Sequence, residues 1–136
     1  MRLQLTNTMT QPINKYFNDP VDKYFGIPAN EWIERIPNEL EVDAVGLWQI
    51  IPVGRDSFNL SGADLEDFTK RSIIALINRG AVPVRPARAM DGFWEKQLQY
   101  GNSPAEIANA IIDEWKVSGV DPDRDGTWFS IFDDKR

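Results

Sequence analysis

Two stretches of the chain place apolar residues at helical spacing and also carry the signals that begin and end a helix. Residues 61–79 start at Ser61, a favourable N-cap residue, and stop before Gly80, which suits the position after a helix. Residues 103–117 open with the sequence SPAE, a capping box with proline in the first turn. Both stretches are therefore predicted to be helices.

Three shorter apolar segments predict β-strands. The sequence AVGLWQIIPV, residues 44–53, is almost continuously apolar, which is typical of a strand covered on both faces. AVPV, residues 81–84, contains Pro83 and is therefore expected at a sheet edge or at a strand end. TWFSIF, residues 127–132, is rich in aromatic and β-branched residues. Because a helix separates the first two strands, we expect a right-handed crossover between them.

Two further short helices complete the predicted order. ANEWIERI, residues 29–36, is ended by Pro37, and DGFWEKQLQY, residues 91–100, is ended by Gly101. Strands and helices follow one another without a linker, so one domain is expected over residues 1–136. About three strands with three to four helices indicate an α+β fold or a small α/β fold.

A short repeat lies near the N-terminus. KYFNDP, residues 15–20, and KYFGIP, residues 23–28, share the pattern K-Y-F-x-x-P, whose prolines disfavour a long helix. We expect an aromatic and proline-rich strap whose pairs Tyr16–Phe17 and Tyr24–Phe25 pack onto the core. An aromatic contact surface is the alternative. Residues 1–12 are polar and are expected to be flexible.

The composition narrows the chemistry that the chain can perform. Its 136 residues contain no cysteine and no histidine. This excludes disulfides, thiol nucleophiles, serine–histidine catalysis and zinc sites built on thiolates or imidazoles. An enzyme would have to work with carboxylates, lysine, tyrosine or a hard metal, so we expect no catalytic activity.

The net charge of −6 bears on the choice of partner. Nucleic acids are disfavoured because phosphate binding needs a basic surface. A basic protein would be attracted, although an acidic surface also serves solubility alone. No segment approaches the ~20 apolar residues of a membrane helix, and the N-terminus lacks the apolar run of a secretory signal. We therefore expect no membrane contact and a cytoplasmic location.

One acidic stretch, VDPDRDGTWFSIF at residues 120–132, resembles the first half of a calcium-binding loop. Asp121, Asp123 and Asp125 stand at the first three ligand positions, and Thr127 could offer its carbonyl. The closing glutamate is missing, because that position is Phe132. We therefore interpret the stretch as a helix-to-strand turn, with Asp and Gly as ordinary turn residues, and keep the metal site as the alternative.

The surface acids and one tryptophan form the candidate contact residues. The partner-binding candidates are Asp121, Asp123, Asp125, Trp128, Asp133 and Asp134, with Glu39, Glu41 and Asp43 as a second patch. Trp128 is equally well explained as a core residue. The basic cluster Arg79, Arg85 and Arg88 is a candidate for binding a carboxylate or phosphate group, or is a solvated loop that offsets nearby acids.

These features favour a non-catalytic protein-binding module. One concrete form is a bacterial immunity or antitoxin-type inhibitor that covers a basic toxin through acidic steering and aromatic anchors. The first alternative is a small calcium- or ligand-binding module that uses Asp121, Asp123, Asp125 and Thr127. The second is an enzyme that works with a pair of carboxylates.

Overall fold

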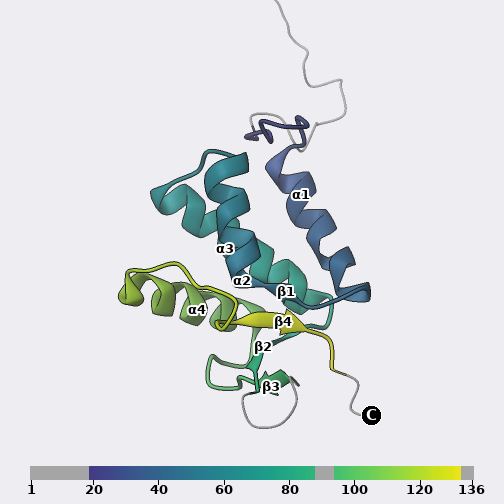
Figure 1. The fold of residues 1–136 in the computed structure, drawn as a ribbon, viewed down its shortest axis with the longest axis vertical. Helices are drawn as coiled ribbons and strands as arrows, with labels where there is room; N and C mark the ends of the chain where they lie inside the picture. The colour runs from purple at the N-terminus through teal and green to yellow at the C-terminus, as the bar shows by residue number, and fades with distance from the viewer. Residues whose placement is uncertain (1–18, 88–93, 133–136) are drawn as a thin grey trace, which may run out of the picture.

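The structure, a computed structural model, describes residues 19–87 and 94–132. In this part of the chain, four α-helices and a four-stranded antiparallel sheet form one α+β domain around a single buried core (Figure 1). The α-helices are α1 (Ala29–Arg35), α2 (Leu47–Pro52), α3 (Gly62–Asn78) and α4 (Pro104–Ser118). A 3-10 helix, Ile36–Glu41, follows α1, and a π-helical turn, Val53–Ser57, follows α2. The α+β class expected from the sequence is confirmed.

The sheet interleaves strands from both halves of the chain. Its strands are β1 (Val45–Gly46), β2 (Val82–Pro86), β3 (Trp94–Lys96) and β4 (Trp128–Ser130), in the spatial order β1-β4-β2-β3. Because β4 is antiparallel to both β1 and β2, those two strands run in the same direction with β4 between them. The expected strand–helix–strand unit therefore exists, but the last strand of the chain separates its two strands.

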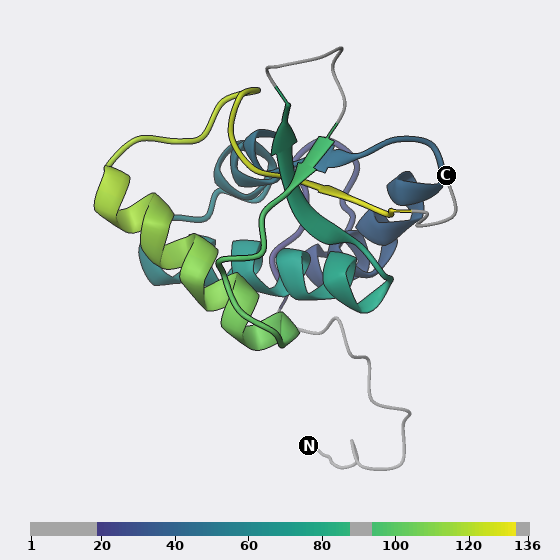
Figure 2. The same ribbon diagram turned by 90° about the horizontal axis from the view of Figure 1, so that it is seen from below.

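The helices cover one face of the sheet. Figure 1 places α1, α2 and α3 on the same side of the strands, and Figure 2 shows the strands crossing in front of α3, with α4 alongside. Phe129 of β4 points into this layer and is fully buried, as is Phe68 of α3. Since successive side chains of a strand alternate, Trp128 lies on the opposite face of the sheet. This alternation decides which aromatic residues belong to the core.

The segment 44–53 is not the strand that its apolar run predicted. Only Val45 and Gly46 pair with β4, and the chain then turns into α2. Gln49 assists this turn, because its side-chain oxygen accepts the Gly46 N–H at 2.8 Å. Ile50 and Ile51 are both fully buried in the core. A continuous apolar run is compatible with a buried strand or a buried helix, and packing against α3 selects the helix here.

The segment 91–100 was also assigned wrongly, as a helix. Trp94–Lys96 forms β3, which pairs with β2 so that Glu95 lies opposite Arg85. Residues 97–100 are not helical, and residues 91–93 lie outside the described part of the chain. Pairing with β2 overrides the weak helical pattern, because aromatic residues such as Trp94 are also favourable in strands.

Pro83 does not mark a sheet edge, because β2 is an interior strand. The carbonyl of Pro83 accepts the N–H of Gln97 at 2.9 Å, one residue beyond the end of β3. The N–H that proline lacks would point to the same side, where the ladder with β3 has already ended. Pro83 is thus tolerated inside β2 because the neighbouring strand, β3, ends beside it.

The signals at the helix ends were mostly predictive. Ser103 caps α4 by accepting the Glu106 N–H at 3.1 Å, and Glu106 in turn accepts the Ser103 N–H at 3.1 Å. Gly119 ends α4 with φ of 72°, a left-handed conformation that favours glycine. Ser61 occupies the N-cap of α3, but its side chain makes no capping hydrogen bond.

The aromatic pair of the second N-terminal repeat was expected to pack onto the core, but it is exposed. Tyr24 is 65% exposed and Phe25 is 82% exposed. Backbone hydrogen bonds from Asp22 to Ile27 and from Lys23 to Ser57 fix the turn, and the two rings stand at its tip. Residues 1–18, which include Tyr16 and Phe17 of the first copy, lie outside the described residues.

Candidate functional site

Asp121, the first acid of the acidic loop (residues 120–126), is held by two side chains from other elements. The guanidinium of Arg55 contacts both carboxylate oxygens, with Nη2 at 3.3 Å from Oδ1. The indole N–H of Trp115 donates to Oδ1 at 3.0 Å. The hydrogen bond from Arg55 is the main cause that lowers the pKa of Asp121 below its ordinary value, and the bond from Trp115 acts in the same direction. Asp121 therefore fastens the loop to α4 and to the turn after α2.

The rest of the acidic loop is a hydrogen-bonded turn. Asp123 Oδ1 accepts the Asp125 N–H at 2.9 Å, and the Asp123 carbonyl accepts the Gly126 N–H at 3.0 Å. The Thr127 carbonyl, which a calcium ion would need, accepts the Leu47 N–H at 2.9 Å. Within residues 19–87 and 94–132, no three acidic side chains are arranged to hold a metal ion. The geometry therefore supports the interpretation of the loop as a turn.

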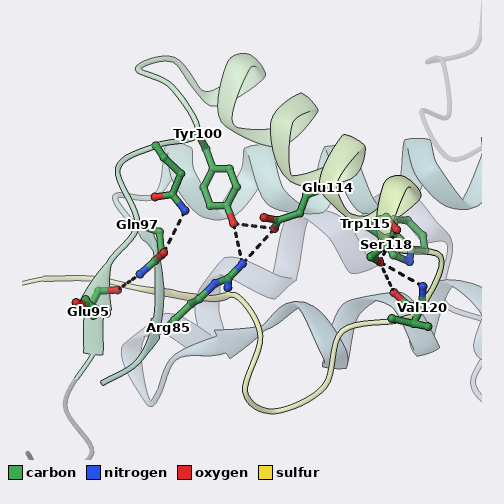
Figure 3. A network of polar contacts seen from close by, with 9 residues as sticks. Arg85, Glu95, Gln97, Tyr100, Glu114, Trp115, Ser118 and Val120 are labelled. Atoms are coloured by element: carbon green, nitrogen blue, oxygen red, sulfur yellow. Dashed lines mark hydrogen bonds and ion pairs between the residues drawn. The ribbon is translucent and has the colours of Figure 1, made fainter. Parts of the chain in front are cut away.

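A pocket of about 290 Å³ lies between the acidic loop and α4, and its wall includes a partnered arginine. Arg85 Nη2 donates to Glu114 Oε1 at 3.2 Å and to the Tyr100 hydroxyl at 3.1 Å. Tyr100 donates to the same Glu114 oxygen at 2.8 Å (Figure 3). These three residues join β2 to the segment before α4 and to α4 itself.

The predicted basic cluster is divided between two places. Arg79, at the end of α3, donates to Asn38 at 3.1 Å and to Glu41 at 2.7 Å. Arg85 instead faces Glu114, so the two arginines pair with acids on different elements. Arg88 lies outside the described residues. A joint anion site of the three arginines thus stays a prediction.

A larger cleft, of about 530 Å³, brings together acids and tryptophans that are distant in sequence. Its apolar wall consists of Trp32, Ile36, Val45, Ile50, Val53 and Trp128. Its polar side chains are Arg35, Glu39, Asp43 and Gln49. We call it the acidic–aromatic cleft. Three predicted contact residues, Glu39, Asp43 and Trp128, line it together, and its volume is within the range of ligand pockets, about 300–1,000 Å³.

The acids of this region differ in whether their side chains form hydrogen bonds or ion pairs within the protein. Glu41 forms the ion pair with Arg79, and Asp43 accepts the Ala44 N–H at 2.7 Å. Arg35 pairs with Glu31. The side chain of Glu39 is exposed and makes no hydrogen bond or ion pair within the described part of the chain. The cleft therefore presents two carboxylates, those of Glu39 and Asp43, that no arginine or lysine of these ranges neutralises.

Trp128 packs against other aromatic residues and also lines the cleft. It is half-buried between Trp48 and Trp94, whose ring centroids lie 6.2 Å and 5.2 Å from its own. Its indole N–H donates to the Arg124 carbonyl at 2.8 Å. A Cβ on Gly46 would come within 3.1 Å of Trp128 and 2.6 Å of Trp48, so glycine permits this packing. Trp128 is thus fixed in place and still borders the cleft.

Sequence reasoning missed the apolar residues of the cleft wall other than Trp128, among them Trp32. Their apolar character was visible, but the cleft joins the segment 32–53 to Trp128, and only the strand pairing of β1 with β4 brings these parts together. Asp133 and Asp134, also predicted as contact residues, lie outside the described residues.

Comparisons with protein-family models, with curated proteins and with solved structures found no match to this chain. Across residues 19–87 and 94–132, no helix combines the length and the apolar character needed to cross a membrane.

Proposed function

We propose that this protein is a non-catalytic binding module for a basic protein partner, in the form of a cytoplasmic inhibitor of the immunity or antitoxin type. The observation that carries the proposal is the convergence of Glu39, Asp43 and Trp128 on one cleft. Two carboxylates beside an aromatic wall suit a positively charged protein surface, because they combine attraction with apolar burial.

The distribution of charge supports a basic partner. Residues 29–43 contain five acidic residues and one arginine, a net charge of −4, out of −6 for the whole chain. Clustered charge of one sign raises the rate at which an oppositely charged protein arrives. Two of these five acids, Glu39 and Asp43, line the cleft and pair with no arginine or lysine of the described residues.

The rigidity of the aromatic wall supports a protein interface as well. Trp128 is held by two neighbouring tryptophans and by its hydrogen bond to Arg124. Trp32 is held against Phe68 of the core, with ring centroids 5.2 Å apart. Side chains that are fixed before binding lose little conformational entropy on association, and tryptophan is enriched among the residues that dominate interfaces.

Co-purification from the native host tests the proposal. The tagged full chain is compared with Glu39→Gln/Asp43→Asn and with the matched variant Asp123→Asn/Asp125→Asn, which loses the same two charges from the acidic loop. We expect a basic protein that is retained by the native chain and by the loop variant, is weakened in the cleft variant, and is released as salt rises. Retention of no basic protein, or equal retention by all three chains, would contradict the proposal.

The inhibitory part of the proposal has its own measurement. Once the partner is purified, its activity is assayed with increasing amounts of this chain. We expect loss of activity at equimolar chain, with the cleft variant requiring a higher concentration than the loop variant. If the partner keeps its activity in a saturated complex, the protein is a binding module and the inhibitory part of the proposal is wrong.

A further inference from the structure

We infer that the acidic–aromatic cleft is a recognition site for one long basic side chain, arginine or lysine, of the partner protein. This inference rests on the proposed function and deepens it, because it names the group that the cleft receives. The cleft offers an apolar wall that includes Trp32 and Trp128, together with the carboxylates of Glu39 and Asp43.

The two halves of such a side chain match the two parts of the cleft. Arginine and lysine carry an aliphatic stem and a charged head, and they lay the stem along apolar surface while the head stays near water. Trp32, Ile36 and Val53 provide the apolar surface. Glu39 and Asp43 are exposed, so a guanidinium or ammonium group can reach them without complete desolvation.

The charges of the cleft select a cation over an anion or a neutral ligand. Its one arginine, Arg35, already pairs with Glu31, whereas Glu39 and Asp43 have no cationic partner in residues 19–87 and 94–132. A carboxylate or phosphate ligand would meet two like charges. A neutral apolar ligand would contact the apolar wall but would form no ion pair with either carboxylate.

One contact of the same chemical kind occurs beside the cleft. The guanidinium carbon of Arg124 lies 5.2 Å from the ring centroid of Trp48, which packs against Trp128. A cation over a tryptophan face at this distance is attracted by the ring quadrupole. Trp48 itself does not line the cleft, so this contact is a nearby example of a guanidinium over a tryptophan ring and not a contact within the cleft.

The test uses short peptides in place of the unidentified partner. Acetyl-Gly-Arg-Gly-amide and its lysine analogue are titrated into the full chain, and the indole N–H signals are followed by NMR after assignment with single Trp→Phe variants. The same peptide with citrulline, which has the shape of arginine without the charge, is the matched ligand control. The indole of Trp115 lies at the other pocket and is the internal reference.

We expect saturable shifts at Trp128 and Trp32 with the arginine and lysine peptides, and none at Trp115. Glu39→Gln/Asp43→Asn should weaken binding about two- to thirtyfold, since two exposed ion pairs together contribute about 0.4–2 kcal/mol. Asp123→Asn/Asp125→Asn, which changes the net charge equally, should leave it within about twofold.

Several results would overturn the inference. Equal binding of the citrulline peptide would show that the cleft recognises apolar surface and not charge. A lack of saturable binding by all three peptides would show that the cleft is not a binding site for such side chains. Binding of free agmatine without binding of the peptides would indicate a small-molecule cation site instead of a protein contact. If the peptides fail while partner retention still depends on Glu39 and Asp43, this inference is lost and the proposed function stands.

Discussion

The acidic loop and the acidic–aromatic cleft contain carboxylates in the same three situations. Asp121 in the loop and Glu41 beside the cleft each pair with an arginine. Asp123 and Asp43 each accept a backbone N–H of a nearby residue. In each region a third acid, Asp125 or Glu39, is exposed without such a side-chain contact in the described residues.

The two regions differ in what surrounds these acids. The pocket at the loop has a volume of about 290 Å³, and the arginine that lines it, Arg85, pairs with Glu114 of the same pocket. The cleft has about 530 Å³ and is walled by two tryptophans, while the arginine that lines it is paired elsewhere. The two regions therefore resemble each other in their acids and differ in the volume and the tryptophan lining of the hollow beside them.

The largest expected effect concerns the aromatic wall of the cleft. Gly46→Ala should lower the free energy of unfolding by about 1–3 kcal/mol, because its Cβ would overlap Trp48 at 2.6 Å and crowd Trp128 at 3.1 Å. Urea denaturation measures this change. In a Trp48→Ala background the same substitution should cost less, because the closest atoms are gone. A loss below about 0.5 kcal/mol in the native background would show that the tryptophans are loosely placed.

Local signals explain which parts of the fold could be predicted from the sequence. The ends of α3 and α4 were predictable because residues such as Ser103, Glu106 and Gly119 act on residues within one turn of themselves. The fate of residues 44–53 was not, because an apolar run fits a buried strand and a buried helix equally. Only packing against α3, formed by residues later in the chain, decides between them.

For the candidate site, too, the sequence could indicate some features and not others. Glu39, Asp43 and Trp128 could be selected from the sequence as acids and an aromatic residue. Their convergence could not, because Trp128 reaches the cleft through the pairing of β4 with β1, which are far apart in the chain. At Asp121 the sequence favoured a turn and kept a metal ligand as the alternative, and it gave no sign that a distant arginine, Arg55, contacts the carboxylate.

A smaller effect is expected from the acid that the loop uses internally. Asp121→Asn should destabilise the protein by about 0.2–1 kcal/mol at neutral pH, as is usual for an exposed ion pair. Asp125→Asn is the matched control, because Asp125 has no side-chain partner in the described ranges, and it should change stability less. Equal losses in chemical denaturation of the two variants would mean that the pair with Arg55 contributes nothing.

The pH dependence of this difference follows from the pKa of Asp121. Contact with Arg55 lowers that pKa in the folded protein below the ordinary value of 3.8. The ionised form is thus favoured by folding, and its contribution is fully present well above pH 3.8. It is lost as the pH falls from there through the folded pKa. The native chain and Asp121→Asn should therefore converge in stability at acidic pH, and a constant difference down to about pH 2 would contradict this explanation.

The smallest effect on stability is expected at the cleft itself. Glu39→Gln/Asp43→Asn should change the free energy of unfolding by no more than about 0.5 kcal/mol, because both residues are exposed and an asparagine at position 43 keeps a side-chain oxygen that can accept the Ala44 N–H. A slight stabilisation at low salt is expected, since the change relieves repulsion within the −4 charge of residues 29–43. A loss above about 1 kcal/mol in urea denaturation would show that these carboxylates serve the fold. If stability is unchanged, weaker binding by the same variant cannot be attributed to unfolding, and it must come from the carboxylates that the cleft exposes.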